Sequence, residues 1–363
     1  MGPARSPGSR NGSPAGAGWG RGCCRAVGTH RRDLRGTAGD DSPLRASRRS
    51  RAASDTTPMV RRALACPRVE VIMTGFATNN ARLSSGDDPA MRKSARQKSL
   101  HRKREVARAF GNAASSYDRY AILQHRVAHD LAQFIAGKRV AAPYLEIGCG
   151  TGFLGAALED HLAGIPCLFT DLSLPMVARC RERLEASVKD ASFAVMDGEM
   201  LAVAERYGLV AASLVFQWFE NLPAAIVRLA DCLVSGGRLA FTMLGEGSLQ
   251  EWRVACDDHG VESGIPSFPT ARELEQAWPG GGEGWVEEVR IPRCHVSAIE
   301  FLHELKAIGA HVPDPAHVPQ APGKMRALLR EIDSKNGNGE NGASFSVTYH
   351  VLYGIFTRNG GAS

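Results

Sequence analysis

The feature that most constrains the fold is a glycine-rich turn that lies between an apolar run and a helical pattern. Residues 145–152 read Leu-Glu-Ile-Gly-Cys-Gly-Thr-Gly, and residues 153–158 continue with the apolar spacing of a helix. A strand, a tight glycine turn and a helix in this order are typical of nucleotide-binding βα units. Glycines at alternate positions let the backbone approach a ligand closely. The turn therefore predicts a parallel α/β sheet with a ligand at the end of this strand.

The spacing of the glycines and one acidic residue indicate which ligand this is. Gly148, Gly150 and Gly152 follow a G-x-G-x-G pattern, which differs from the G-x-G-x-x-G pattern of dinucleotide sites. Glu146 precedes the first glycine by two positions, where a carboxylate would repel a pyrophosphate and attract the cationic aminoacyl end of S-adenosylmethionine. We therefore interpret the turn as the first motif of an S-adenosylmethionine-dependent methyltransferase. The alternative is a tight turn that binds no ligand.

Acidic and aromatic side chains near the ends of later strands extend this interpretation. Asp171 ends the second predicted strand, where it could accept hydrogen bonds from ribose hydroxyls, and Asp197 ends the third, where it could accept from the adenine amino group. Gln217 and Trp218 follow the fourth strand, where the transferable methyl group would project. Tyr117, upstream of the sheet, is a candidate lid over the cofactor. The ordinary alternatives are a capping or solvated acid, a core aromatic and a helix anchor.

Charge is divided unevenly along this chain, whose formal net charge is +6. Residues 1–104 contain 22 Lys and Arg against 7 Asp and Glu, whereas residues 105–363 contain 22 against 31. The predicted folded region is therefore acidic. The basic overall balance gives no reason to expect a nucleic-acid partner for that region.

Cysteine spacing and hydropathy exclude two further classes of protein. The nine cysteines form no C-x-x-C pair and no Cys/His cluster with zinc spacing, so we expect no metal site. Scattered single cysteines favour reduced thiols in a cytosolic protein. The longest apolar run, Leu209–Phe219, is shorter than the roughly 18 residues that suggest a membrane span. We therefore expect a cytoplasmic protein with no membrane partner.

The N-terminal region, residues 1–100, is rich in Gly, Pro, Ser and Arg and has no sustained apolar period. Such a composition buries too little apolar surface to offset the entropy of ordering, so we expect disorder. A translation start placed too far upstream is one explanation, with Met59, Met73 or Met91 as the real start. An organelle-targeting peptide and a nucleic-acid-binding arm are the other two. We assign this region no function.

From Arg104 onward, strand and helix patterns alternate as in a parallel sheet covered on both faces. The predicted strands are 143–148, 166–171, 192–197, 209–216, 238–244, 285–292 and 346–357. The predicted helices are 120–135, one from about 175, 223–233, 249–257, 271–278, 297–310 and 325–332. The sequence therefore predicts one methyltransferase domain, 104–358. Its fold class is α/β, a Rossmann-like seven-stranded sheet with helices on both faces and a helical cap, 246–284 and 297–343, inserted between the late strands.

Three segments identify a family more narrowly than the glycine turn does. They are the entry 106–118, the helical segment 305–310 (Leu-Lys-Ala-Ile-Gly-Ala) and the strand segment 348–352 (Thr-Tyr-His-Val-Leu). With these motifs, residues 104–357 resemble the malonyl-[acyl-carrier protein] O-methyltransferase family of biotin synthesis. The departures are small: Gly198 stands where the family tends to have Ala, and Pro-Arg-Cys-His follows the sixth strand.

The resemblance implies a class I methyltransferase whose cofactor is S-adenosylmethionine. Its substrate would be the free carboxylate of a malonyl thioester, carried by acyl-carrier protein or coenzyme A. The product would be the methyl ester that primes pimeloyl synthesis for biotin. A carboxylate is already ionised at pH 7, so the reaction needs no general base. We expect a monomer.

The malonyl carboxylate needs a cation or hydrogen-bond donors in an otherwise dry pocket. Lys306, Tyr349, His350 and Tyr117 are the candidates, and Trp218 would wall the site. Acyl-carrier proteins are acidic, so a basic patch is expected near the mouth of the site. Its candidate members are Arg290, Arg293, Lys324, Arg326 and Arg330.

Two other functions remain open at this stage. A related methyltransferase that acts on a quinone precursor or another small acid would share the motifs of the first five strands and differ only in the cap. A factor that binds S-adenosylmethionine for assembly or regulation, without methyl transfer, would share the cofactor residues.

Overall fold

The structure of the protein is a computed structural model in which residues 89–203, 206–335 and 345–360 are described. All of them belong to the second of the chain's two compact units, Leu64–Ser363. Residues 1–88 lie outside the described residues, so the three interpretations of the basic N-terminal region stay predictions.

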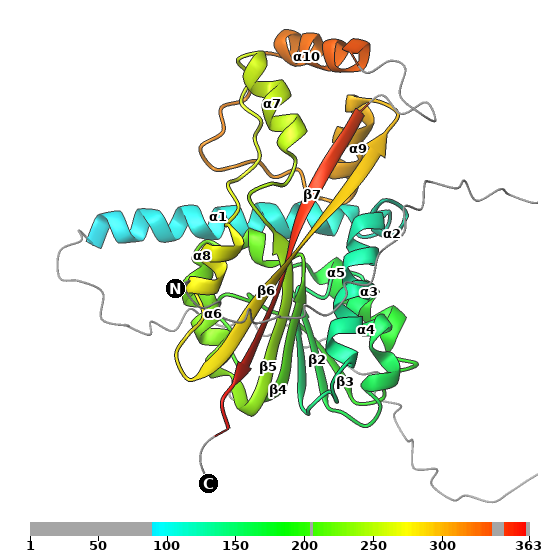
Figure 1. Cartoon of the computed structure of the whole chain (residues 1–363), viewed down its shortest axis with the longest axis vertical. Helices are drawn as coiled ribbons and strands as arrows, with labels where there is room; N and C mark the ends of the chain where they lie inside the picture. The colour runs from blue at the N-terminus through cyan, green and yellow to red at the C-terminus, as the bar shows by residue number, and fades with distance from the viewer. Residues whose placement is uncertain (1–88, 204–205, 336–344, 361–363) are drawn as a thin grey trace, which may run out of the picture. The chain divides into compact units, whose positions relative to one another are not determined.

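Seven strands form one mixed sheet in the order β3-β2-β1-β4-β5-β7-β6 (Figure 1). They are β1 Tyr144–Ile147, β2 Cys167–Asp171, β3 Ala191–Val195, β4 Tyr207–Ser213, β5 Leu233–Leu244, β6 Gly282–His295 and β7 Phe345–Arg358. Strands β1 to β5 run parallel, and β7 pairs antiparallel with both β5 and β6. The predicted sheet is confirmed. Because β1 to β4 run parallel, their carboxyl ends meet at one edge of the sheet.

Helices cover both faces of the sheet and enclose two apolar cores, because neighbouring residues of a strand point to opposite sides. Tyr144 of β1 belongs to the first core, and Leu145 belongs to the second. The first core includes α3 and α5, and the second includes α6 and α8. The helices near the sheet are α2 Tyr117–Tyr120, α3 Ile122–Ala136, α4 Phe153–Ala157, α5 Leu174–Leu184, α6 Leu222–Asp231 and α8 Ala271–Gln276.

The apolar spacing of Val106, Ala109 and Phe110 predicts a short helix that ends at Gly111, but the helix that precedes the sheet is longer. Helix α1 spans Pro89–Ala113, so the boundary that we expected at 100–104 falls inside it. Its first half has no apolar period, but from Ala90 to Phe110 it lacks Gly and Pro and is rich in the good helix formers Ala, Arg and Lys. In Figure 1, α1 crosses the carboxyl edge of the parallel strands. Neither α1 nor any other described helix is long and apolar enough to span a membrane.

Two insertions between the late strands supply the cap. Helices α7 (Gln250–Asp258) and α8 lie between β5 and β6, and α9 (Ala298–Ala307) and α10 (Pro322–Lys335) lie between β6 and β7. Helix α8 packs on the sheet, because its Leu274 is buried in the second core. The cap therefore consists of α7, α9, α10 and their loops, which lie beyond α1 from the parallel sheet (Figure 1).

A buried serine fastens the first insertion to the last strand. The Ser248 hydroxyl donates to the backbone oxygen of His350 at 2.9 Å and accepts from its backbone nitrogen at 3.1 Å. Ser248 is fully buried, so water cannot replace either hydrogen bond.

We predict that Ser248→Ala lowers the free energy of unfolding by about 1–3 kcal/mol, because it leaves the buried N–H of His350 without this acceptor. The matched control is Ser334→Ala, since the Ser334 hydroxyl donates to the Glu331 backbone oxygen on an exposed face of α10. The control should change stability by at most about 0.5 kcal/mol. Urea unfolding measures both, and equal effects of the two substitutions would refute the prediction.

Candidate functional site

Two cavities meet at the carboxyl edge of the sheet. The first cavity is lined by the glycine turn, the ends of β2, β3 and β4, and the inner face of α1. The second cavity is lined by α3, the cap loops, α9 and β7. They share four residues, namely Phe110, Tyr117, Leu214 and Trp218. The second cavity has a volume of about 350 Å³, which is in the range of small-molecule sites.

The glycine turn forms one wall of the first cavity. Gly148, Gly150 and Gly152 have φ angles of 62°, 53° and 89°, in the left-handed region that favours glycine. A Cβ atom at Gly148 would lie 2.3 Å from Cγ2 of Val215, whereas one at Gly150 would meet no atom within 4 Å. The backbone at Gly150 therefore leaves open space for a ligand to approach closely.

Asp171 lies beside this turn at the end of β2 and lines the first cavity. Its carboxylate accepts hydrogen bonds from the backbone nitrogens of Gly150 at 3.0 Å and Ser173 at 2.8 Å. Burial raises the pKa of Asp171 to about 6, although these backbone hydrogen bonds oppose the rise. The backbone thus fixes the orientation of an acceptor group at the position predicted for ribose.

Glu146 lies beneath the turn and does not line either cavity. The Tyr144 hydroxyl donates to its carboxylate at 2.7 Å. Burial raises the pKa of Glu146 to about 8, which the hydrogen bond from Tyr144 opposes and the nearby Asp171 reinforces. A direct attraction for a cationic ligand was expected from the sequence. In the structure Glu146 is buried and lines neither cavity, so its role toward the ligand stays a prediction.

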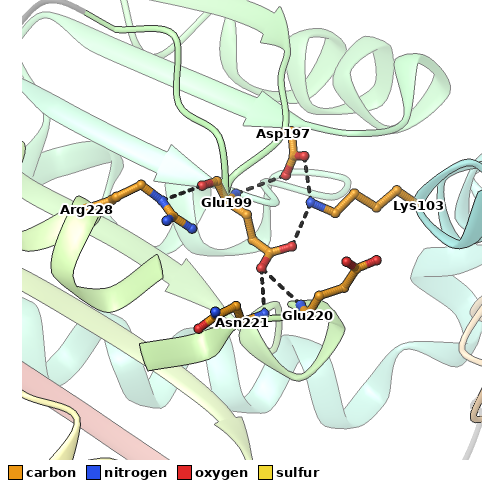
Figure 2. Close-up of polar contacts among 6 residues, drawn as sticks. All are labelled: Lys103, Asp197, Glu199, Glu220, Asn221 and Arg228. Atoms are coloured by element: carbon orange, nitrogen blue, oxygen red, sulfur yellow. Dashed lines mark hydrogen bonds and ion pairs between the residues drawn. The ribbon is translucent and has the colours of Figure 1, made fainter. Parts of the chain in front are cut away.

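The acid predicted at the end of the third strand belongs to an ion-pair cluster with α1 (Figure 2). The Lys103 ammonium lies 2.7 Å from Asp197 Oδ2 and 2.7 Å from Glu199 Oε2. Burial lowers the pKa of Lys103, but its hydrogen bonds and ion pairs with the two carboxylates outweigh this effect and leave the pKa raised. Glu199 also accepts from the backbone nitrogens of Glu220 at 3.0 Å and Asn221 at 2.9 Å.

Lys103 is not among the residues predicted at the site, although the pattern of α1 contains a signal for it. Lys103, Val106, Ala107 and Phe110 follow the i, i+3, i+4, i+7 spacing of one helix face, and all four line the first cavity. A lysine in register with an apolar stripe is unusual, because lysine is seldom buried unless it is paired. Its partners come from the segment that follows β3, and Asp197 lies 94 residues further along the chain, so the sequence does not reveal them.

Aromatic rings enclose the junction between the two cavities. Phe110 and Trp218 pack edge to face with their centroids 5.4 Å apart, and Tyr117 lies 6.4 Å from Phe110. Leu214 lies at the same place in a left-handed conformation with φ of 54°. Aromatic faces attract a ligand cation, so this junction suits a positively charged sulfur. Tyr117 and Trp218, which the sequence singled out separately, thus both lie at this junction beside Phe110.

Several predicted polar groups line the second cavity. The Gln217 side-chain nitrogen donates to the Leu214 backbone oxygen at 2.6 Å, and its Oε1 is buried without a hydrogen-bond partner among the described residues. Gln217 was predicted at the cofactor, but it lines only the second cavity. Lys306 of α9 and Tyr349 of β7 line the same cavity. Burial raises the pKa of Tyr349 above its ordinary value, so its hydroxyl stays protonated.

His350 and the five predicted basic residues lie elsewhere in the described structure. The Nε2 atom of His350 lies 2.7 Å from Glu288, and its Nδ1 accepts from Gly247 at 3.2 Å, so the ring holds the loop after β5. Arg293 pairs with Glu304 at 2.9 Å. None of these residues lines either cavity, and the same holds for Arg290, Lys324, Arg326 and Arg330.

The residues that line the first cavity match the polar and apolar groups of S-adenosylmethionine. Open space adjoins the Gly150 backbone. The carboxylates of Asp171 and Asp197 offer acceptors for ribose and adenine donors, and the side chains of Met196 and Leu172 provide apolar surface for a base. The aromatic junction lies where the sulfonium end would reach the second cavity.

We predict that Gly150→Ala weakens S-adenosylmethionine binding by at least about tenfold, because its Cβ would fill the space beside the turn. Gly164→Ala is the matched control, since Gly164 also has a positive φ, of 70°, and open space, but lines neither cavity. Both substitutions should cost about 1–2 kcal/mol of stability from left-handed strain. Titration calorimetry and urea unfolding separate the two effects. Unchanged affinity in Gly150→Ala would contradict the assignment.

We also predict that S-adenosylmethionine affinity falls as the pH is lowered through about 6, the pKa of Asp171. The raised pKa means that the ionised form, the better acceptor, is lost below this value. Affinity should fall by up to about tenfold per pH unit below the midpoint. Asp171→Asn should bind more weakly and lack this step. Identical pH profiles of the two proteins, measured by calorimetry, would exclude the role.

Comparison with known proteins identifies the family. Residues 145–239 match the family model described as "Methyltransferase domain". Malonyl-[acyl-carrier protein] O-methyltransferase of Magnetococcus marinus is 41% identical over 71% of this chain and 94% of its own length. The same-named protein of Pseudescherichia vulneris is 32% identical over 72% of this chain and all of its own length. The Biotin biosynthesis bifunctional protein BioCD of Bordetella avium is 33% identical over 69% of this chain and 52% of its own length. The chain therefore belongs to the malonyl-[acyl-carrier protein] O-methyltransferase family of S-adenosylmethionine-dependent enzymes.

Proposed function

We propose that this protein transfers a methyl group from S-adenosylmethionine to the free carboxylate of malonyl-[acyl-carrier protein], as a step in biotin synthesis. The names of its relatives support the reaction, and the name of the bifunctional relative supports the pathway. The observation that carries the proposal is the meeting of two cavities at an aromatic junction. One cavity fits the methyl donor, and the other offers Lys306 and Tyr349 to an acid.

The methyl donor would be held by residues that the sequence singled out. Asp171 would accept from the ribose hydroxyls and Asp197 from the adenine amino group, while the open space beside Gly150 lets the backbone come close. When bound, S-adenosylmethionine supplies a methyl group on a positively charged sulfur. Phe110, Tyr117 and Trp218 would exclude water from that end of the cavity, which strengthens electrostatic attraction there.

The acceptor carboxylate would be bound and oriented in the second cavity. It is ionised at pH 7, so the chain's residues need not remove a proton. The Lys306 ammonium and the protonated Tyr349 hydroxyl would hold one carboxylate oxygen and leave the other directed at the junction. Holding the reacting atoms in line lowers the barrier by removing their translational and rotational freedom. The work of catalysis is therefore positioning and exclusion of water.

We infer that the protein is a cytosolic monomer. The six described cysteines, Cys149, Cys167, Cys180, Cys232, Cys256 and Cys294, are all free, which supports a reducing compartment.

The proposed reaction is tested with methyl-labelled S-adenosylmethionine and malonyl-acyl-carrier protein, followed by mild alkali. Release of volatile labelled methanol is expected, because alkali hydrolyses a methyl ester. Label that is transferred but retained would mean methylation at carbon or nitrogen and would refute the proposal. Labelled methyl ester formed only from a quinone precursor or another small acid would assign the protein to the related methyltransferases. Cofactor binding without transfer to any malonyl thioester would indicate a non-catalytic binding protein.

We predict that Tyr349→Phe raises the KM for malonyl-acyl-carrier protein by about tenfold, the cost of losing one hydrogen bond to a charged group. The affinity for S-adenosylmethionine should not change, because Tyr349 lines only the second cavity. Tyr353→Phe is the matched control. It lies on the same strand and face, lines neither cavity and has a buried hydroxyl without a partner among the described residues. Equal KM values for the two variants would exclude Tyr349 from the acceptor site.

A further inference from the structure

A surface groove leads from the outside of the protein toward the second cavity. We call it the outer groove; one wall is α1 and the other is the segment 311–317 that follows α9. Four residues of the segment also line the second cavity, namely His311, Val312, Pro313 and His317. The outer groove therefore adjoins the cavity where we place the acceptor.

Helix α1 separates the outer groove from the first cavity, and its two faces differ. The inner face presents Lys103, Val106, Ala107 and Phe110 to the first cavity. The outer face presents Lys98, His101, Glu105 and Arg108 to the groove, at the spacing of one helix face. Arg102 lines both the first cavity and the outer groove. Its guanidinium donates to the Pro313 backbone oxygen at 2.8 Å, which joins α1 to the opposite wall of the groove.

The charge of α1 is opposite to that of the rest of the domain. Helix α1 contains eight Lys and Arg and one acid, Glu105. Residues 114–363 contain 21 Lys and Arg against 30 Asp and Glu. A partner that is itself acidic would be repelled by most of the domain and attracted by this helix.

The cations of the outer face are exposed and available to a partner. Lys98 and Arg108 form no ion pair with any carboxylate among the described residues. The two acids that line the groove are already engaged: Glu105 lies 3.2 Å from His101, and Asp314 accepts from the Ala316 backbone nitrogen at 2.8 Å. The side chains able to bind an anion at the groove are therefore the basic ones.

Resting on the proposed function, we infer that the outer face of α1 docks the acidic carrier protein and that the outer groove receives its thioester arm. A malonyl group can enter an enclosed cavity only on a long arm, and that arm is joined to the carrier through an anionic phosphodiester. Lys and Arg side chains bind phosphate oxygens well. Lys98 and Arg108 lie at the surface end of the groove, which continues into the second cavity. This arrangement matches an arm whose anionic phosphodiester lies near the carrier and whose malonyl group lies further in.

This surface differs from the patch expected from the sequence. Lys324, Arg326 and Arg330 lie on α10 and line neither the groove nor either cavity. Continuity with the acceptor cavity also favours a carrier protein over a nucleic acid, because a nucleic acid has no group to place in that cavity.

The test compares two malonyl thioesters, one on the carrier protein and one on free pantetheine, which lacks both the protein and the phosphate. The double variant Lys98→Glu with Arg108→Glu should raise the KM for the carrier-bound substrate by about tenfold or more, with kcat little changed. Its kinetics with malonyl-pantetheine should equal those of the unmodified protein, which also shows that the variant is folded. Added salt should weaken the unmodified protein's use of the carrier substrate and have little effect on the variant.

The matched control is Lys324→Glu with Arg330→Glu, which reverses the same number of exposed charges on α10. It should behave as the unmodified protein on both substrates. The docking proposal is overturned if the α1 variant keeps its KM for the carrier substrate, if it loses both substrates equally, or if the α10 variant loses the carrier substrate instead. An α1 variant that loses only binding to a random oligonucleotide would assign the face to nucleic acid. If the unmodified protein methylates neither thioester, the proposed function itself has failed.

Discussion

The ion pairs of Lys103 with the carboxylates of Asp197 and Glu199 hold helix α1 against the first cavity (Figure 2). The cluster is largely shielded from water, since the three side chains are 16%, 21% and 5% exposed. Glu199 also accepts backbone hydrogen bonds at the start of α6, and Arg228 donates to its backbone oxygen at 2.8 Å. Removing one partner of such a buried pair costs about 3–5 kcal/mol, because a charge is left uncompensated.

The position of α1 determines three features at once. Its inner face closes the first cavity, its Phe110 ring forms part of the junction, and its outer face forms one wall of the groove. In the sites that we propose, a single helix would separate the methyl donor from solvent and offer a basic surface to the acceptor's carrier. The junction also contains backbone strain at Leu214, because its φ is positive. The Leu214 N–H donates to the backbone oxygen of Thr242 at 2.9 Å and to its Oγ1 at 3.0 Å. Such a conformation costs about 1–3 kcal/mol and persists where surrounding contacts impose it.

Most of the fold could be predicted because its signals are local. Apolar runs such as β4, the glycine turn and the alternation of strands and helices each depend on neighbouring residues. The acids at the ends of β2 and β3 were found for the same reason, since parallel strands bring their carboxyl ends together. The extent of α1 was missed, because it depends on helix propensity without an apolar period, and Lys103 was missed because its partners are distant in the sequence. His350 shows a different limit: side chains alternate along a strand, so a residue next to Tyr349 faces the other side of the sheet.

We propose that the methyl donor and the malonyl carboxylate occupy two cavities that meet at the ring of Trp218. A crystal structure of the protein with S-adenosylhomocysteine and malonyl-pantetheine tests it most directly. We predict the ribose at Asp171, the adenine amino group at Asp197, and the carboxylate within hydrogen-bonding distance of Tyr349 or Lys306. A nucleoside bound away from the glycine turn, or a carboxylate that does not face the homocysteine sulfur, would contradict the account.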